Sequence, residues 1–157
     1  MTLAWLASVA IAAPAAGAST HIKAAGCFIP TSKGVVVGVG RFHGDLRIPM
    51  GKHKPGESAQ QTAVRETREE CGLVVRVGPL LRTFEEGRVY LFLCTPIAPI
   101  DDYSHLAPED GAEIAEVIVL DPNSMIAHDG RKITHPWRFA HDRALMIELY
   151  HQYENKY

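Results

Sequence analysis

The chain has 157 residues, of which 46% are hydrophobic and 22% are charged, and this composition is typical of one soluble globular domain. Sixteen Lys and Arg residues against eighteen Asp and Glu residues give a formal net charge of −2. A DNA-binding module is therefore disfavoured, because such modules hold phosphates through a basic excess.

The first twenty residues differ from the rest of the chain. Met1 to Thr20 carries no charged side chain, and its short apolar stretch is interrupted by Pro14. The stretch resembles a secretory signal without the usual basic start, and it is too short for a stable membrane span. We expect an apolar, Ala-rich extension over residues 1–20 and a folded domain over residues 21–157. The expected location is cytoplasmic, with export as the alternative if residues 1–18 act as a signal.

Two segments with strand character open the folded part, and the second is β-branched. His21–Ile29 and Val35–Val39 are typical of strands, and the turn between them predicts a hairpin. Phe42–Pro55 is rich in Gly and Pro and predicts a loop.

A helix is predicted over Ser58–Cys71. Ser58 followed by Gln61 forms a capping box, and Gly72 is a natural helix stop. Further along the chain we predict strands at Leu73–Leu81, Arg88–Thr95 and Val117–Leu120, a surface loop at Ala98–Glu113 and a closing helix at Phe139–Tyr153. The predicted fold is of the α/β class, a mixed sheet with a helix on each side.

The cysteines do not form a recognisable motif. Cys27, Cys71 and Cys94 are odd in number, without C-x-x-C spacing and without a neighbouring His at ligand spacing. They are predicted to be free, mostly buried thiols in a reducing compartment.

Three glutamates on the predicted helix carry the chemistry. Glu66, Glu69 and Glu70 fall within an arc of roughly 100° on a helix of 3.6 residues per turn, so their like charges repel. A divalent cation would remove this repulsion, and oxygen ligands without Cys or His favour Mg²⁺ or Mn²⁺ over zinc. Arg65 lies one turn before Glu69 and has Glu57 within reach, which predicts a bidentate pair that orients the carboxylates.

The same segment resembles the Nudix box, G-x5-E-x7-R-E-U-x-E-E-x-G-U with U an aliphatic residue. The matching positions are Gly51, Glu57, Arg65, Glu66, Glu69, Glu70, Gly72 and Leu73. One position departs from the pattern, since Thr67 stands at the first aliphatic site and its hydroxyl needs a partner if it is buried. The preceding segments Ala24–Ile29, Gly34–Arg41 and Ile48–Pro49 are also similar to this family.

The resemblance implies an α/β/α sandwich that hydrolyses nucleoside diphosphates linked to another moiety, with water and a divalent metal. It implies catalytic roles for Glu57, Arg65, Glu66 and Glu69. The implied metal ligands, for Mg²⁺ with Mn²⁺ as a substitute, are Glu66, Glu69, Glu70 and the backbone carbonyl of Met50 or Gly51. One box glutamate, or Glu113 or Glu116 on a later segment, is the expected general base.

The substrate is less well defined by sequence. Tyr90 has the spacing of a base-stacking tyrosine in dinucleoside polyphosphate hydrolases, although an aromatic residue in an apolar strand is also typical of a core. Lys52 and Glu113 are further candidates for substrate contact, and His135–Ala144 is loosely similar to a segment of ADP-ribose-cleaving members. Nucleoside triphosphates, dinucleoside polyphosphates and ADP-ribose-like compounds therefore stay open.

We expect a small-molecule nucleotide as the partner and a monomer or homodimer. The alternative function is a nucleotide-sensing Nudix domain without catalysis.

Overall fold

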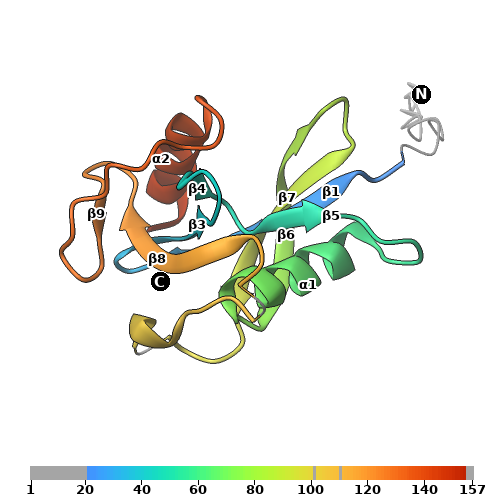
Figure 1. The fold of residues 1–157 in the computed structure, drawn as a ribbon. Coiled ribbons are helices and arrows are strands. Elements are labelled where there is room, and N and C mark those ends of the chain that lie inside the picture. The colour runs from blue at the N-terminus through green and yellow to red at the C-terminus, as the bar shows by residue number, and fades with distance from the viewer. Residues whose placement is uncertain (1–20, 101, 110, 155–157) are drawn as a thin grey trace, which may run out of the picture.

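The computed structural model describes residues 21–100, 102–109 and 111–154 (Figure 1). The predicted extension at residues 1–20 thus lies outside the described residues. In chain order the elements are β1 (Ala24–Phe28), β2 (Pro30–Thr31), β3 (Gly34–Gly40), β4 (Leu46–Arg47), β5 (Met50–Lys52), α1 (Ala59–Cys71), β6 (Val75–Phe84), β7 (Val89–Pro96), the 3-10 helix η1 (Tyr103–His105), β8 (Ile114–Asp121), β9 (Ile126–Ala127) and α2 (Asp142–Tyr153). Among the described helices, none is both long and apolar enough to cross a bilayer.

The strands form two sheets. The first has the order β5-β1-β7-β6, in which β1 and β7 are parallel and the other pairs are antiparallel. The second has the order β2-β3-β8-β9, with β4 added to β3. The predicted hairpin between His21–Ile29 and Val35–Val39 is wrong: β3 pairs instead with β2, a two-residue strand in the expected turn where Pro30 faces Val35. β1 pairs with β5 and β7.

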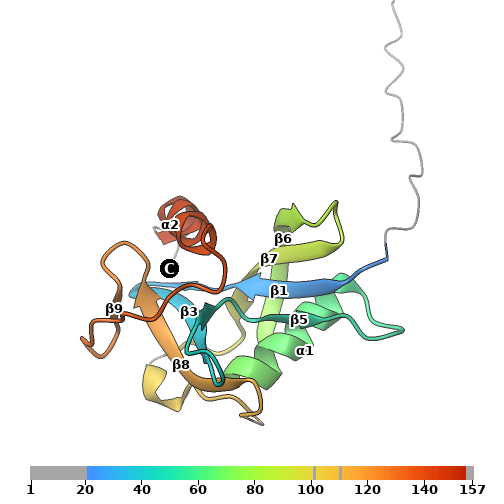
Figure 2. The ribbon, with the colours of Figure 1, turned by 45° about the horizontal axis from the view of Figure 1, so that its top comes forward.

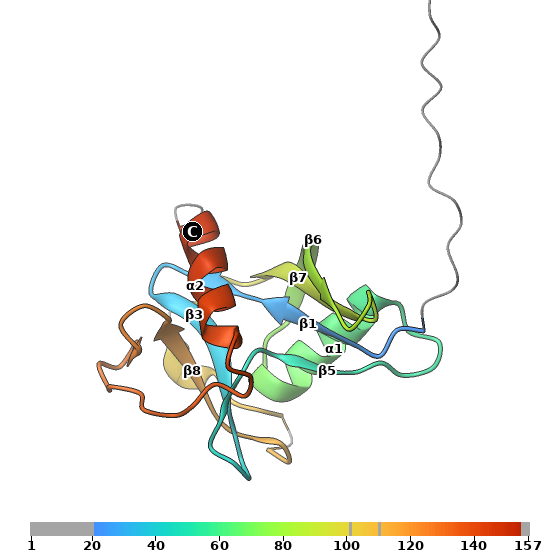
Figure 3. The same cartoon turned by 90° about the horizontal axis from the view of Figure 1, so that it is seen from above.

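The two helices lie on opposite sides of the sheets, as Figures 1, 2 and 3 show from three directions. Side chains alternate along a strand, and Val35 and Val37 of β3 pack in a core cluster with Met146 and Leu149 of α2. Val36 belongs to a second cluster with residues of α1. The predicted α/β sandwich around a mixed sheet is therefore confirmed.

Both ends of α1 are determined by local sequence. The hydroxyl of Ser58 accepts a hydrogen bond from the backbone N–H of Gln61 (3.1 Å), and the side chain of Gln61 accepts one from the N–H of Ser58 (2.7 Å). Gly72 closes the helix with a φ of 69°, a left-handed conformation that suits glycine. The predicted capping box and helix stop are confirmed.

Several short elements were not predicted. Phe42–Pro55 contains β4 and β5 in place of a continuous loop, because Leu46 pairs with Val39 and Gly51 with Ala25. β9 is likewise formed by pairing, with Ala127 opposite Leu120. Strands of two or three residues depend on a distant partner strand, so local sequence gives no signal for them.

The prediction of three free thiols is wrong. Cys27 and Cys94 form a disulfide with a Cα–Cα distance of 5.5 Å, whereas Cys71 is free and buried. Cys27 lies opposite Phe92 in the parallel β1–β7 pair, so Cys94 lies diagonally across on the same face of the sheet. The two cysteines are 67 residues apart, and only the strand pairing brings them together.

Denatured, alkylated protein is expected to carry one modified cysteine, Cys71, before reduction and three after it. Reduction should lower the free energy of unfolding by roughly 2–4 kcal/mol, because the bond closes a long loop in the unfolded chain. Mass spectrometry and denaturant unfolding with and without dithiothreitol measure the two effects. In the control, the Cys27→Ala/Cys94→Ala variant, dithiothreitol should leave the stability unchanged. Three modified cysteines before reduction would contradict the disulfide.

Thr67 stands at the first aliphatic site of the box pattern, and its hydroxyl lowers the stability of the fold. Its side chain is fully buried in α1, and its hydroxyl has no hydrogen-bond partner within the described residues. A buried hydroxyl without a partner loses its hydration without compensation. Thr62, also fully buried on α1, donates a hydrogen bond to Glu57 (2.8 Å).

Thr67→Val is therefore expected to raise the free energy of unfolding by about 1 kcal/mol, since valine has the same shape without the unpaired group. Thr62→Val is the matched variant and should be destabilising, because it removes a hydrogen bond that is made. Urea unfolding of both variants checks this. A Thr67→Val protein less stable than the parent would show that the hydroxyl has a partner.

Candidate active site

A close contact between strands places β5 against β1. A Cβ atom at Gly26 would lie 2.3 Å from the carbonyl oxygen of Pro49, so only glycine allows this approach. The N–H of Cys27 donates to the same oxygen (2.9 Å). The end of β5 is thereby held beside α1, which packs on β1 and follows β5 in the chain.

Arg65 is the centre of the site. Its guanidinium donates to both carboxylate oxygens of Glu57, at 2.6 Å from Nε and 3.0 Å from Nη2. Nη1 donates to Glu66 (2.6 Å) and to Glu69 (3.0 Å), and Nη2 also reaches the carbonyl of Lys52 (2.8 Å). The predicted bidentate pair between Arg65 and Glu57 is present, and it ties α1 to the loop before it and to β5.

This pairing controls protonation. The hydrogen bonds from Arg65 are the main cause that lowers the pKa of Glu57 to about 2, and the same contacts raise the pKa of Arg65. Both side chains are mostly covered, with 15% of Arg65 and 19% of Glu57 exposed. The pair therefore stays ionised across the neutral range.

Glu66 and Glu70 face β5. A Cβ at Gly51 would lie 2.1 Å from a carboxylate oxygen of Glu66, so glycine is required beside this carboxylate. Glu70 accepts a hydrogen bond from the backbone N–H of Met50 (2.9 Å). Burial raises the pKa of Glu66, and it raises the pKa of Glu70 to about 8, with further contributions from the charges of Glu66 and Glu113.

The donor set fits a hard divalent cation. Within the described part of the chain, no three His, Cys, Asp or Glu side chains are arranged to hold a metal as they stand, since Glu66 and Glu69 are turned onto Arg65 and Glu70 onto Met50. Nevertheless, partly buried carboxylates of like charge beside a close-approaching backbone glycine are the oxygen donors that suit a hard divalent cation. These residues therefore fit Mg²⁺ or Mn²⁺, because they are oxygen donors and because the carboxylates lie together on α1 beside β5.

The carboxylates form one wall of a cavity of about 830 Å³. Its other walls come from the β4–β5 segment, the β6–β7 turn, the loop before β8 and the segment before α2. Figure 2 shows these segments around the β1–β5 pair. A cavity of this size suits a small-molecule ligand.

Only some of the other predicted site residues line the cavity. Lys52 and Glu113 line the cavity. Tyr90 does not: its ring stacks on Phe92 (centroids 6.3 Å apart) and packs with the cluster under α1, on the opposite face of β7 from Val89, which lines the cavity. Glu116 forms an ion pair with Arg131 and is not among the cavity-lining residues.

Sequence reasoning missed several cavity residues. Arg47 on β4 and Phe84 at the end of β6 line the cavity, yet neither belongs to a local pattern. Arg138, Phe139 and His141 also line it. The similarity of their segment to that of ADP-ribose-cleaving members is a signal that pointed to these three.

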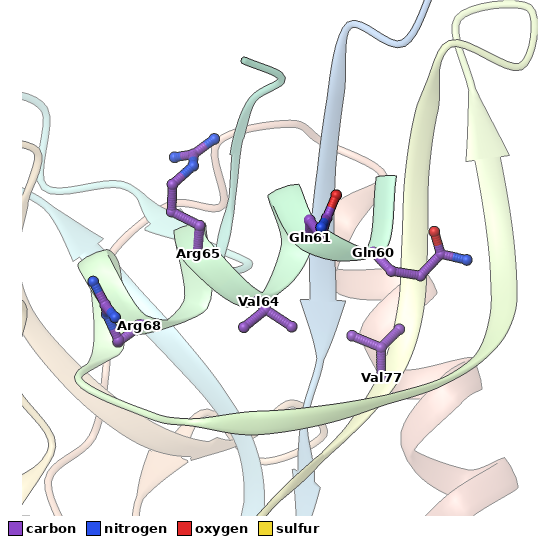
Figure 4. Close-up of a pocket in the computed structure, with 6 residues that line it drawn as sticks. All are labelled: Gln60, Gln61, Val64, Arg65, Arg68 and Val77. Atoms are coloured by element: carbon purple, nitrogen blue, oxygen red, sulfur yellow. The ribbon is translucent and has the colours of Figure 1, made fainter. Parts of the chain in front are cut away.

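A smaller depression of about 430 Å³ lies on the outer side of α1. Figure 4 shows Val64 of α1 and Val77 of β6 at this depression, while Arg65 points away from them. Arg65 directs its guanidinium to the carboxylates of the larger cavity. The residues that line the outer depression include no carboxylate.

Residues 20–141 match the model of the NUDIX domain. The chain belongs to the Nudix family, and the predicted resemblance is confirmed. Human mitochondrial coenzyme A diphosphatase NUDT8 is 32% identical over 118 residues, which cover 71% of this chain and 49% of that protein. The chain thus spans about half the length of this curated relative.

Solved structures share the fold. An ADP-ribose pyrophosphatase from Streptococcus suis superposes with a TM-score of 0.62 at 15% identity, over 82% of this chain and 88% of that one. A Caenorhabditis elegans Ap4A hydrolase gives a TM-score of 0.56 at 21% identity, over 85% and 96% of the two chains. Both structures thus share the Nudix fold with this domain.

Arg65→Lys is expected to lower the melting temperature, because an ammonium cannot reproduce the planar fork that holds Glu57 together with Glu66 and Glu69. Arg68→Lys is the matched control, since Arg68 lies on the same helix with 55% of its side chain exposed and pairs with Glu109. Thermal unfolding should show a clear loss for Arg65→Lys and little change for Arg68→Lys. Equal melting temperatures for the two variants would contradict a central role for Arg65.

Proposed function

We propose that this protein hydrolyses the phosphoanhydride bond of a nucleoside diphosphate linked to another moiety, with Mg²⁺ as its metal and Mn²⁺ as a substitute. The observation that carries the proposal is the Arg65 network, which fixes α1 against β5 with Glu66, Glu69 and Glu70 on one wall of the large cavity. Family membership supports the same reaction class.

The chain's own residues have separate tasks. Glu66, Glu69, Glu70 and the carbonyl of Gly51 would hold the metal, which would neutralise charge on the phosphate oxygens and make the attacking water more acidic. Glu57 and Arg65 orient the helix. Lys52 and Arg47 face the cavity and attract the phosphates.

Glu113 is the proposed general base. It lines the cavity, and its charge acts on Glu70, so it lies near the metal-binding carboxylates. It would take the proton of the water that attacks phosphorus in line with the leaving oxygen. Glu116, the other later candidate, is engaged by Arg131.

The relatives support a nucleotide substrate without selecting one. They include a coenzyme A diphosphatase and an ADP-ribose pyrophosphatase, which both act on a diphosphate, and an Ap4A hydrolase. We propose a substrate of this class, with nucleoside triphosphates, dinucleoside polyphosphates, ADP-ribose and coenzyme A as the compounds to assay.

The disulfide bears on the compartment. A Cys27–Cys94 bond is typical of an oxidising environment, so it favours the exported alternative over the cytoplasmic location. We propose a monomer or homodimer.

Glu70→Gln is expected to lower kcat/KM by at least about 100-fold, because a metal ligand contributes several kcal/mol of transition-state stabilisation. The glutamine can still accept the hydrogen bond from Met50, so the fold should persist. Glu116→Gln is the control and should keep the parent rate. The assay is LC–MS of the products from the compounds named above, with Mg²⁺, with Mn²⁺ and with EDTA.

Metal-dependent cleavage that EDTA abolishes and Glu70→Gln impairs would support the proposal and identify the substrate. If no compound is cleaved although nucleotides raise the melting temperature, the domain is a nucleotide sensor and the proposed hydrolysis is wrong.

A further inference from the structure

The placement of Tyr90 outside the cavity leaves open what would recognise the base of a nucleotide. Three aromatic side chains line the cavity, namely Phe84, Phe139 and His141. Phe84 packs against the hydrophobic core. Phe139 is 54% exposed and borders the same cavity as the box carboxylates.

Phe139 is part of a stack of flat groups. Its ring lies nearly parallel to that of His141, with an interplanar angle of 11° and centroids 5.9 Å apart. The guanidinium carbon of Arg138 lies 5.5 Å from the centroid of the Phe139 ring. We call Arg138, Phe139 and His141 the planar stack, since three flat π-bearing groups are presented by four consecutive positions of the chain.

The backbone of the planar stack is held on both sides. The N–H of Arg138 donates to the carbonyl of Leu46 in β4 (3.0 Å). The carboxylate of Asp142 accepts from the N–H of Phe139 (3.3 Å), and the N–H of Asp142 returns a bond to the carbonyl of Phe139 (3.0 Å). Asp142 is buried at the start of α2, so these exposed rings are mounted on fixed backbone.

Arg47 supplies positive charge in the same cavity. Arg47 lines the cavity, and its charge acts on Glu70. Arg47 also forms a bidentate pair with Asp45 at 3.0 Å, and Arg138 acts on the same Asp45 carboxylate. The cavity therefore brings together acidic, cationic and aromatic side chains.

We propose that the planar stack is the nucleobase subsite: the base of the nucleotide adds to the exposed side of the stack that Phe139 and His141 form, while its phosphates pass Arg47 toward the box carboxylates. This assignment rests on the proposed function, because it names where the substrate's base lies in the same cavity. Every base has a π-face, so stacking on such a surface is tolerant of base identity. The subsite therefore distinguishes diphosphates that carry a base from diphosphates that do not.

The first test is binding of 1,N6-etheno-ADP, followed by fluorescence anisotropy with Mg²⁺ present. Phe139→Ala should raise its Kd about tenfold, since stacking of one base on an aromatic side chain is of this size. Phe42→Ala is the matched control, because Phe42 is 77% exposed and is not among the residues that line the cavity. Phe139→Tyr keeps the ring and should keep the affinity.

The second test separates binding from chemistry. With a cleaved nucleotide as substrate, Phe139→Ala should raise KM and leave kcat nearly unchanged. With ribose 5-diphosphate, which has no base, the variant and the parent should be equal. An unchanged Kd and KM in Phe139→Ala overturn the subsite.

The two tests also distinguish this inference from the proposed function. Hydrolysis with the parent KM in Phe139→Ala refutes the subsite and leaves the hydrolase in place. Weaker etheno-ADP binding in Phe139→Ala, in a protein that cleaves no diphosphate, supports the subsite and refutes hydrolysis.

Discussion

Arg65 donates to three carboxylates and one backbone carbonyl, and the geometry of the site depends on these bonds. Glu57 holds the guanidinium from the loop side and Lys52 holds it from β5. Glu66 and Glu69 are thereby kept together on one side of α1 despite their like charges, which would otherwise repel. An arginine is needed because its planar fork can bond several oxygens at fixed angles.

The rest of the domain holds α1 in place against the sheet. The helix packs on the sheet through a core cluster that includes Ala63, Cys27 and Cys94, and the disulfide joins β1 to β7 within that cluster. Gly26 lets β5 approach β1 closely. The backbone of Met50 and Gly51 in β5 therefore lies directly beside Glu66 and Glu70 of α1, with both elements held in place.

Charge divides the large cavity into regions. Burial and mutual repulsion make the ionised state of Glu70 costly without a cation, whereas Arg47 on β4 supplies positive charge nearby. Arg138, Phe139 and His141 lie on the segment before α2. A diphosphate with a flat group at one end carries groups that match each of these kinds of side chain.

The sequence by itself determined α1 and its chemistry. The Ser58–Gln61 box, the Gly72 stop and the arc of Glu66, Glu69 and Glu70 are local features with periods and caps that can be read directly. The β-branched run of β3 is equally local, and it predicted the strand.

Only the tertiary structure decided which residues meet across the fold. Cys27 reaches Cys94 through the parallel pairing of β1 and β7, and β4 and β5 exist as strands because of distant partners. Tyr90 lies on the face of β7 opposite the cavity because side chains alternate along the strand. Arg47 and Phe139 line the cavity from two separate segments. Contacts between residues far apart in the chain depend on register and packing, which no short pattern in one sequence specifies.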